Sequence, residues 1–427
     1  MKILWKHTHI LDVIEGTIKE NMDLCVEDGR IVAMGEDLDC DADEVIDGRE
    51  KLLTPGFVNA HTHLGMSLLR NLADDMELHS WLNDAIWPFE AKMTGEDIYW
   101  GTKLSLAELI DSGVTCYCDM YGDMDRVGDA TLEAGMRGVL TLGMIEDDKR
   151  EKRLRTMEEL YKNYHRPEEG LKVAAAPHAI YTCGGEFIKD IMAIADEYDG
   201  AVHIHMSETI KEVEDCKKEH GMTPVRYVES LGMLEHRVIA AHCVHMTEEE
   251  LDLVKDKPFY PVNNPTSNLK LASGFAPVDA MLKRGIKVCI GTDGSSSNNN
   301  QNLLEEMHIA SVLNKAVTMD PKAVPAIEVL RMATINGAYA LGWEEEIGSL
   351  EVGKSADIVV FNLESPSFTP KNNLVNALCY SAQTSDITDV MVRGRFLKKN
   401  GKHQVLDVEE IRREVAQRTA RILKEME

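Results

Sequence analysis

The stretch of sequence that decides the fold reads Pro55-Gly56-Phe57-Val58-Asn59-Ala60-His61-Thr62-His63. Its apolar first half is typical of a buried β-strand, and side chains two residues apart on a strand point to the same face. His61 and His63 can therefore offer two imidazoles to one metal ion. An isolated His-x-His is about as often a chance pair or a hydrogen-bonded core pair, so the rest of the chain has to decide.

Polar residues follow three other apolar, strand-like runs in the same manner. These runs are Val202-His203-Ile204-His205-Met206-Ser207-Glu208, Val238-Ile239-Ala240-Ala241-His242 and Val288-Cys289-Ile290-Gly291-Thr292-Asp293. Because the carboxyl ends of barrel strands meet at one face, the pattern indicates a metal site distributed over several strand ends. We leave His203 out of this site, since it lies between Val202 and Ile204 and we expect it to line the opposite face of its strand.

The ordered set resembles the amidohydrolase superfamily. Its metal-dependent hydrolases and deaminases use His-x-His on the first barrel strand, a His after strand five, a His after strand six and an Asp after strand eight. The resemblance spans nearly the whole chain. It implies a neighbouring histidine, His242, and four metal ligands: His61, His63, His205 and Asp293.

The two ends of the chain share a pattern of short alternating strands. Residues 1–55 alternate apolar and polar positions, with Asp28-Gly29 as a hairpin signal, and the pattern returns in residues 356–361 and 390–397. We predict that the ends build one small β-sandwich from residues 1–55 and 346–427, the second part including a C-terminal helix. The resemblance implies the same arrangement.

Between the ends, apolar runs alternate with amphipathic helical segments, which predicts parallel βα units of the α/β class. We expect a (β/α)8 TIM barrel over residues 56–345. Its strands are predicted at residues 54–61, 114–119, 137–144, 171–177, 201–205, 238–242, 258–262 and 288–292. The candidate functional residues fall at or just after the carboxyl ends of such strands, where active sites of these barrels lie.

The composition excludes some partners. The 427 residues include 46 basic and 73 acidic side chains, and the formal charge of −27 repels phosphate backbones and anionic lipid surfaces. We therefore expect a small-molecule substrate, and neither a nucleic acid polymer nor a membrane as partner. Nine scattered cysteines indicate free thiols in a reducing compartment. With no signal-peptide pattern and no apolar run of membrane-spanning length, the expected location is the cytoplasm.

The expected metal centre holds a single ion. Binuclear members of the superfamily bridge two metals with a carboxylated lysine or a glutamate at the end of strand four, whereas this strand ends Ala174-Ala175-Ala176-Pro177-His178. Imidazole and carboxylate ligands suit Zn2+, and Fe2+ or Mn2+ are the alternatives. Asp293 has one competing interpretation, as a turn or helix-capping residue.

A hydrolytic deaminase also needs a proton carrier. A divalent metal lowers the pKa of bound water from 15.7 to about 7 and so supplies hydroxide. Glu208 lies three residues after His205, which resembles the His-x-x-Glu of deaminases in the superfamily and implies that Glu208 protonates the ring nitrogen and later the departing amine. His242 is expected to hydrogen-bond the hydroxide and the developing oxyanion, and Asp293 to accept the water proton. The alternative for Glu208 is a solvated surface glutamate.

Within the superfamily, the chain resembles the adenosine-type deaminases that act on S-adenosylhomocysteine and 5′-methylthioadenosine. The segments that carry this resemblance are Trp81-Leu82 with Trp87-Pro88-Phe89-Glu90, Pro177-His178-Ala179-Ile180-Tyr181-Thr182-Cys183 and Glu133-Ala134-Gly135-Met136-Arg137-Gly138. It implies that Glu90 accepts hydrogen bonds from the ribose hydroxyls and that His178 contacts the nucleoside. A helix-surface glutamate and a strand-capping histidine are the competing interpretations.

Two arginines are further candidates for substrate binding. Arg153 falls where such enzymes keep an arginine for the amino-acid tail of S-adenosylhomocysteine, although Arg150 or Arg155 can take this role and a solvated helix face is the competing interpretation. An arginine at the junction that holds Arg137 reaches a neighbouring subunit's site in related enzymes. The resemblance therefore also admits a homo-oligomer.

Other functions have to be weighed against this one. The chain lacks the His-x-Glu and Pro-Cys-x-x-Cys patterns of the cytidine-deaminase fold, which excludes that class. Another amidohydrolase, acting on guanine, cytosine or a chlorinated triazine, is the nearest alternative. A non-catalytic scaffold of the same fold is a further one, but retention of all four ligands together with Glu208 and His242 argues against it.

Overall fold

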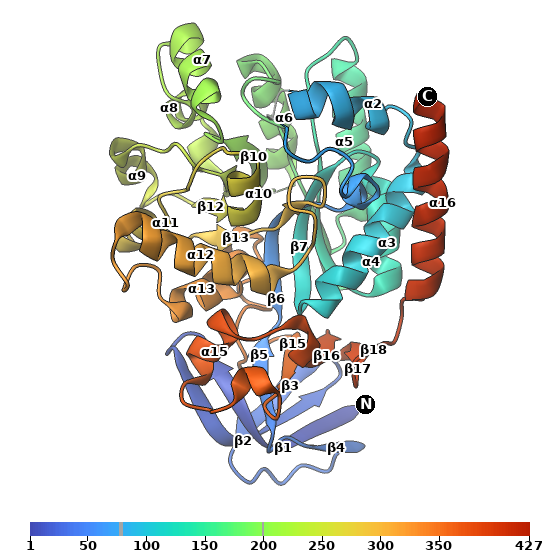
Figure 1. Ribbon diagram of the computed structural model, residues 1–427, viewed down its shortest axis with the longest axis vertical. Helices are drawn as coiled ribbons and strands as arrows, with labels where there is room; N and C mark the ends of the chain where they lie inside the picture. The colour runs from blue at the N-terminus through green and yellow to red at the C-terminus, as the bar shows by residue number, and fades with distance from the viewer. Residues whose placement is uncertain (77–79, 199) are drawn as a thin grey trace.

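The computed structural model describes residues 1–76, 80–198 and 200–427. Among these residues, eight parallel strands form a closed ring (Figure 1). Around the ring they are β6 (Phe57–His63), β7 (Val114–Tyr121), β8 (Arg137–Leu142), β9 (Leu171–Ala174), β10 (Val202–Met206), β11 (Val238–His242), β12 (Phe259–Asn263) and a divided last strand, β13 (Cys289–Ile290) with β14 (Asp293–Gly294). The ring closes where Ala175 pairs with Val202 and where β14 pairs with β6. The TIM-type barrel predicted from the sequence is confirmed.

Helices cover the outside of the ring, as right-handed βα crossovers require. The longer ones are α3 (Gly95–Asp111), α4 (Met124–Ala134), α5 (Arg150–Tyr164), α6 (Gly185–Glu197), α7 (Ile210–His220) and α12 (Leu303–Thr318). Shorter helices lie between them: α8 (Pro224–Ser230), α9 (Glu248–Val254), α11 (Val278–Lys283), α13 (Ala326–Met332) and α14 (Ile335–Ala340). Capping boxes at Thr94 and Thr247 satisfy the first backbone N–H groups of α3 and α9, so both helices begin at these threonines.

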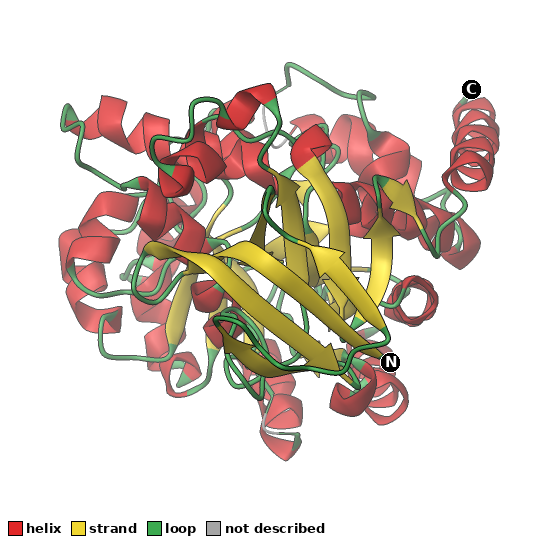
Figure 2. Ribbon diagram, turned by 90° about the horizontal axis from the view of Figure 1, so that it is seen from below, coloured by secondary structure: helices red, strands yellow, loops and turns green. Residues whose placement is uncertain are grey.

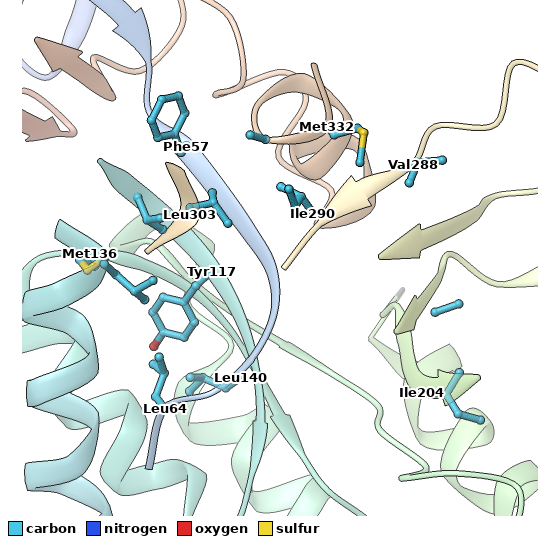
Figure 3. Packing of buried hydrophobic residues seen from close by; sticks show 14 of the residues in the cluster. Phe57, Leu64, Tyr117, Met136, Leu140, Ile204, Val288, Ile290, Leu303 and Met332 are labelled. Carbon is cyan, nitrogen blue, oxygen red and sulfur yellow. The ribbon is translucent and has the colours of Figure 1, made fainter. Parts of the chain in front are cut away.

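The main core lies between the ring and the helices. Figure 3 shows Phe57, Tyr117 and Leu140, which come from three neighbouring strands and belong to one buried cluster. Removing one such side chain from water contributes about 1.5–3 kcal/mol. A second cluster contains side chains from alternate strand positions, among them Val58, Cys116, Cys118, Val139 and Cys289. Both faces of the barrel strands are therefore buried, which accounts for their nearly continuous apolar sequences.

A sheet of nine strands within the described residues combines both ends of the chain and lies below the barrel in Figure 1. The N-terminal part supplies β1 (Lys2–Asp12), β2 (Thr17–Glu27), β3 (Arg30–Gly35), β4 (Glu44–Asp47) and β5 (Lys51–Pro55). The C-terminal part supplies β15 (Ile358–Asn362), β16 (Ile387–Val392), β17 (Arg395–Lys399) and β18 (Lys402–His403). Antiparallel pairing of β5 with β15 joins the two parts. Seen from below, these strands cross beneath the barrel (Figure 2).

The C-terminal helix α16 (Val408–Met426) returns from this sheet and runs along the side of the barrel beside α3 (Figure 1). Arg418 and Arg421 approach the buried carboxylate of Asp97 to 3.3 and 2.5 Å. Leaving this buried charge unpaired would be costly, so the two arginines fix α16 against the barrel.

The first barrel strand begins later than the sequence suggested. It was expected at residues 54–61, but residues 51–55 belong to the terminal sheet and β6 begins at Phe57. Gly56 separates the two strands, and this position requires glycine because an added Cβ would collide with the side chain of Thr115.

The eighth strand, expected at residues 288–292, is interrupted at Gly291 and Thr292. The side chain of Asn59 bonds to both the backbone N–H and the hydroxyl of Thr292, at 3.1 and 2.7 Å, and so satisfies the chain at the break. Beyond the break the chain pairs with β6 instead of β12, which carries Asp293 towards the histidines of β6.

All nine cysteines are free thiols, as predicted, and all but Cys40 are buried. None of the helices in the described residues is both long enough and apolar enough to cross a membrane.

Candidate metal centre and adjoining pocket

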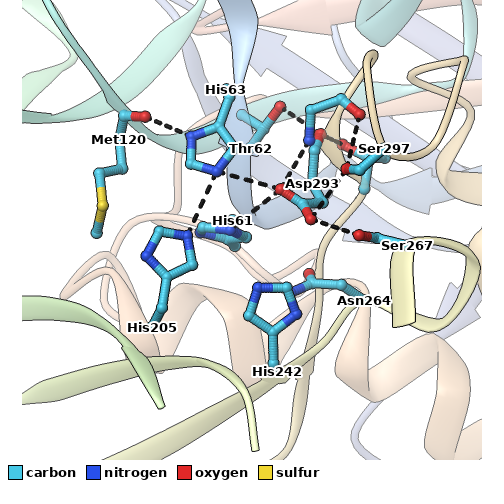
Figure 4. Close-up of polar contacts among 12 residues, drawn as sticks. His61, Thr62, His63, Met120, His205, His242, Asn264, Ser267, Asp293 and Ser297 are labelled. Atoms are coloured by element: carbon cyan, nitrogen blue, oxygen red, sulfur yellow. Dashed lines mark hydrogen bonds and ion pairs between the residues drawn. The ribbon is translucent and has the colours of Figure 1, made fainter. Parts of the chain in front are cut away.

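Side chains from several strands converge at the carboxyl end of the barrel (Figure 4). Asp293 Oδ1 lies 3.4 Å from His61 Nε2 and 3.2 Å from His63 Nε2. His205 Nε2 lies 3.4 Å from His63 Nε2, so the four candidate ligands face a common point. His242 belongs to the same cluster, since one of its nitrogens lies within 4.8 Å of donor atoms of His61 and Asp293. The structure thus brings together all five residues that the sequence assigned to the metal and its surroundings.

Backbone carbonyls hold two of the imidazoles in place. His63 Nδ1 donates to the carbonyl of Met120, and His205 Nδ1 donates to the carbonyl of His178 at 2.9 Å. A carbonyl can only accept, so each ring, in its neutral form, presents an Nε2 lone pair to the centre of the site. This is the tautomer that a histidine needs to bind a metal through Nε2.

His203 corrects an expectation from the sequence. It was expected on the opposite face of its strand, but its ring lies inside the barrel with Nε2 2.9 Å from His61 Nδ1. Residues two apart share a face of a strand, so His203 and His205 point the same way. Val202 and Ile204 pack outward, in the main core between the ring and the helices.

The protonation of the cluster suits a divalent cation. Burial lowers the pKa of His61 to about 4 and places the pKa of His205 well below its usual value, so both rings are neutral. Burial also acts to lower the pKa of His63, but the hydrogen bond to Asp293, the charge of Asp293 and the Met120 carbonyl together outweigh it and raise the pKa to about 9, so without a metal this ring carries a second proton, on the nitrogen that faces Asp293. Burial alone would raise the pKa of Asp293, yet contacts from His61 and His63 hold it well below its ordinary value. His61 Nε2 is buried and, within the described residues, makes no hydrogen bond of normal geometry; Asp293 Oδ1 lies 3.4 Å away, so this nitrogen is available to a metal.

The carboxylate of Asp293 is oriented by three donors. Its Oδ2 accepts from Ser267 at 2.6 Å and from Ser297 at 3.1 Å, and its Oδ1 accepts from the backbone N–H of Gly294 at 2.8 Å. Ser267 belongs to the short helix α10 (Pro265–Lys270), which follows β12. Asp293 itself has φ of 60°, a left-handed conformation that aspartate tolerates at a turn.

Glu208 and His242 face each other beside the metal cluster. His242 Nε2 lies 3.7 Å from Glu208 Oε2, and both side chains are buried. Ser273 donates to Glu208 Oε1 at 3.2 Å, while His242 Nδ1 lies 2.8 Å from Asn268 Oδ1. Glu208 is therefore no solvated surface residue, which removes the competing interpretation of this position.

A buried carboxylate that the sequence did not single out supports Glu208 from behind. Glu212 accepts hydrogen bonds from the backbone N–H groups of Ser207 and Glu208 at 2.9 and 2.8 Å. Burial raises the pKa of Glu212 to about 7. Glu212 lies in the first turn of α7 (Ile210–His220), three residues after the capping Thr209, where its sequence position does not distinguish it from a surface glutamate.

A cavity of about 360 Å3 opens from the metal cluster. Its polar lining includes Glu90 and His178, together with the candidate catalytic residues Glu208, His242 and Asp293. Apolar walls come from the π-helix η2 (Trp81–Ile86), the short helix α2 (Trp87–Glu90) and neighbouring segments: Met66, Trp81, Leu82, Trp87, Ile145 and Leu271. Tyr121, which the sequence reasoning missed, donates its hydroxyl to Glu90 at 2.5 Å, and burial raises the pKa of Glu90.

A second cavity of about 490 Å3 shares Gly122, Asp123 and Gly143 with the first. Arg153 lines it, where its guanidinium contacts Asp147 at 2.6 Å. Arg150 and Arg155 do not line either of the two cavities. Among the three candidate arginines, the structure therefore places only Arg153 next to the pocket.

Arg137 lies elsewhere. It stands at the first residue of β8, the amino end of the strand, whereas the site is built at the carboxyl ends. Its guanidinium is buried, with Nε 2.8 Å from Asp357 and Nη2 2.8 Å from Ser355. Arg137 thus links the barrel to the terminal sheet and does not join the pocket of its own chain, contrary to the expectation that it contacts substrate.

The fold and these donors define a barrel protein with a divalent-metal site at the carboxyl ends of its strands. The model of the amidohydrolase family matches residues 52–397. Over 99% of this chain and all of the relative, the chain is 48% identical to a 5-methylthioadenosine/S-adenosylhomocysteine deaminase of Thermoanaerobacter pseudethanolicus. It is 45% identical to a 5′-deoxyadenosine deaminase of Methanothermobacter thermautotrophicus over 90% of both chains.

Among solved structures, an adenosine deaminase from Xanthomonas campestris with bound zinc superimposes with a TM-score of 0.95 at 33% identity, covering 99% of this chain and 98% of the other. The chain belongs to the amidohydrolase family. The resemblance inferred from the sequence is confirmed.

Proposed function

We propose that this protein is a metal-dependent aminohydrolase that converts adenine nucleosides modified at the 5′ position into inosine analogues and ammonia. The expected substrates are 5′-methylthioadenosine and S-adenosylhomocysteine, with 5′-deoxyadenosine and adenosine as further candidates. The observation that carries the proposal is one cavity lined by the metal cluster, Glu208, His242 and Glu90. Deaminases of such nucleosides among the relatives support the substrate class.

We propose one ion per chain, held by His61, His63, His205 and Asp293. Zinc is the metal we expect, because three imidazoles and one carboxylate suit it and a similar solved structure binds zinc; Fe2+ and Mn2+ fit the same ligands. When bound, the metal supplies an activated water at neutral pH. We assign the water proton to Asp293, whose Oδ1 is turned towards the cluster while Oδ2 is engaged by serines.

Glu208 is proposed as the proton carrier. Attack on the carbon that bears the amine needs a proton on the adjacent ring nitrogen, and the amine must then be protonated to leave. Glu208 is buried at the wall of the cavity and fixed by Ser273 and the Glu212 contact, so it can serve both transfers. With its Nδ1 against Asn268 Oδ1, His242 directs Nε2 towards the same space, where it can accept a hydrogen bond from the attacking water. Donating to the oxygen that gains charge requires a second proton on this ring.

Binding of the nucleoside is assigned to the remaining lining residues. Glu90 would accept hydrogen bonds from the two ribose hydroxyls, His178 would contact the base or ribose, and the tryptophans of η2 and α2 would cover apolar 5′ substituents. Arg153 would meet a carboxylate tail that extends into the second cavity. Another aromatic-ring amidohydrolase accounts less well for Glu90, and a metal-free scaffold would not need the oriented donors of the cluster.

The remaining assignments concern the chain as a whole. We propose that the terminal sheet is a β-sandwich formed by residues 1–55 and 346–427 around a barrel domain of residues 56–345. Free thiols support a reducing compartment, the cytoplasm. A small molecule is the proposed partner, without nucleic acid polymers or membranes, and a homo-oligomer is compatible with this function.

A substrate panel tests the proposal. Purified zinc-loaded protein would be incubated with adenosine, 5′-deoxyadenosine, 5′-methylthioadenosine, S-adenosylhomocysteine, guanine and cytosine, and ammonia release would be followed. We expect the highest kcat/KM with a 5′-modified adenine nucleoside. Faster turnover of guanine or cytosine would overturn the substrate class but leave the metal chemistry standing.

A further inference from the structure

We propose that Thr141 and His203 form, with His61, a directed chain of hydrogen bonds that fixes the tautomer of His61 and thereby raises the metal affinity of the site. Thr141 lies on β8, His203 on β10 and His61 on β6, so the chain crosses the inside of the barrel. The inference rests on the proposed metal site, although not on the identity of the substrate.

His61 differs from the other two imidazoles of the cluster in what its second nitrogen meets. His63 and His205 turn Nδ1 to backbone carbonyls, which accept and never donate, so these rings have no choice of tautomer. His61 Nδ1 meets His203 Nε2 at 2.9 Å. A neutral imidazole carries one donor and one acceptor, so this bond can run in either direction.

Thr141 decides the direction of the hydrogen bond between His61 and His203. His203 Nδ1 lies 3.0 Å from Thr141 Oγ1, and Thr141 Oγ1 donates its single proton to the carbonyl of Asp119 at 2.7 Å. With that proton committed, Thr141 can only accept from His203 Nδ1. His203 is then protonated at Nδ1 and bare at Nε2, so it must accept from His61 Nδ1. His61 is left with a bare Nε2 directed at the metal position.

The opposite direction has a weaker donor. It would need a proton donated to His203 Nδ1, and apart from Thr141 the neighbouring donor is the thiol of Cys118 at 3.4 Å. A thiol is a weak hydrogen-bond donor. If Thr141 lost its hydroxyl, Cys118 could donate, His203 would donate to His61, and His61 Nε2 would carry a proton. Binding a metal would then require a tautomer change at two buried imidazoles, His61 and His203, and a reoriented thiol proton at Cys118.

All members of the chain are buried, so water does not compete for these bonds. His61, His203, Thr141 and Cys118 are 0% exposed, and each bond lies in the interior of the ring. Outer partners of metal-bound histidines typically change metal affinity by about 10- to 100-fold when removed. Thr141 contacts neither the metal position nor the cavity, so it acts as a positioning residue.

The test compares three variants of the full chain prepared free of metal. Thr141→Val removes the hydroxyl and keeps the shape, whereas Thr141→Ser keeps the hydroxyl. Thr115→Val is the matched control, because Thr115 is also fully buried on a barrel strand but its hydroxyl has no hydrogen-bond partner in the described residues. The dissociation constant for Zn2+ would be measured by competition with a chromophoric chelator, in the absence of any nucleoside.

We expect Thr141→Val to weaken Zn2+ binding by about 10- to 100-fold, with Thr141→Ser and Thr115→Val within a factor of about three of the unaltered protein. Nitrogen-15 spectra of the metal-free proteins should show His61 protonated at Nδ1, and at Nε2 in Thr141→Val. Unchanged zinc affinity or an unchanged tautomer in Thr141→Val would overturn the inference. A merely structural role would lower the unfolding temperature of the metal-free protein without the tautomer change, which also contradicts it. The zinc-binding and nitrogen-15 measurements use no nucleoside, so their outcome does not depend on the result of the substrate panel.

Discussion

Replacement of Glu208 by glutamine separates proton transfer from every other property of this residue. Glutamine keeps the length of the side chain and an oxygen that can accept from Ser273, whose hydroxyl lies 3.2 Å from Glu208 Oε1. The variant therefore retains its place in the cavity but cannot release a proton. Positioned acid–base groups contribute about 10²–10⁴-fold to a rate, so kcat should fall by about this factor. Because each factor of ten is about 1.36 kcal/mol, the activation free energy should rise by about 2.7–5.4 kcal/mol.

Metal content should stay unchanged in Glu208→Gln because its carboxylate is not among the four proposed ligands. Ammonia release under single-turnover conditions would report the chemical step, and elemental analysis would report zinc per chain. Glu250→Gln is a suitable control: Glu250 is also buried, but it caps α9 instead of lining the cavity. The substitution Glu208→Gln should slow hydrolysis of a 6-chloro analogue less than deamination of the 6-amino substrate, because chloride departs without a proton.

Two results would refute this reasoning. Near-normal turnover by Glu208→Gln would assign the proton transfers to another group, with His242 the nearest candidate at 3.7 Å. Loss of zinc along with activity would show that Glu208 supports the metal site and that the rate does not report proton transfer.

Other substitutions test the ligands and the tail subsite. Asp293→Ala should abolish detectable turnover and lower zinc retention, since it removes the only carboxylate among the proposed ligands. For the unaltered protein, full activity after dialysis against a chelator, or two essential metals per chain, would contradict the single-ion site. Arg153→Ala should raise KM for S-adenosylhomocysteine by about ten- to a hundredfold, because a charge-assisted hydrogen bond contributes about 1.5–3 kcal/mol, and leave 5′-methylthioadenosine nearly unaffected. Arg155→Ala, on the same helix but with its side chain 65% exposed, is the matched control, and equal losses on both substrates would assign Arg153 to folding.

The metal cluster could be predicted because local sequence determines it. His61 and His63 share one strand, and the alternation of a strand is enough to place both on one face. His205, His242 and Asp293 each follow an apolar run, and a parallel barrel necessarily gathers such ends. The same logic locates Arg137 at the amino end of β8, away from the site of its own chain and buried against Asp357.

His203 shows where strand alternation was applied too narrowly. Apolar neighbours indicate the buried face of a half-exposed strand, but both faces of a barrel strand are buried, one against helices and one inside the ring. Val202 and Ile204 therefore carried no information about the direction of His203. Its spacing of two from His205 did, and that spacing repeats the His-x-His motif of β6.

Contacts that orient the catalytic groups lie beyond local pattern, because parts of the chain that are distant in sequence supply them. Ser273 meets Glu208 across 65 residues, and Tyr121 meets Glu90 across 31. Neither Ser273 in its loop nor Tyr121 at the end of β7 carries a sequence signature of its partner, so only the closed barrel brings each pair together. Burial then changes the chemistry of the pair: a carboxylate that would be ionised and mobile in water is held in one orientation, beside the substrate, with its solvation replaced by a few fixed donors. Glu208 is positioned to act as a proton carrier for this reason. Because Glu208→Gln keeps the contact with Ser273, a loss of rate in that variant would be assigned to the missing proton and not to the orientation of the side chain.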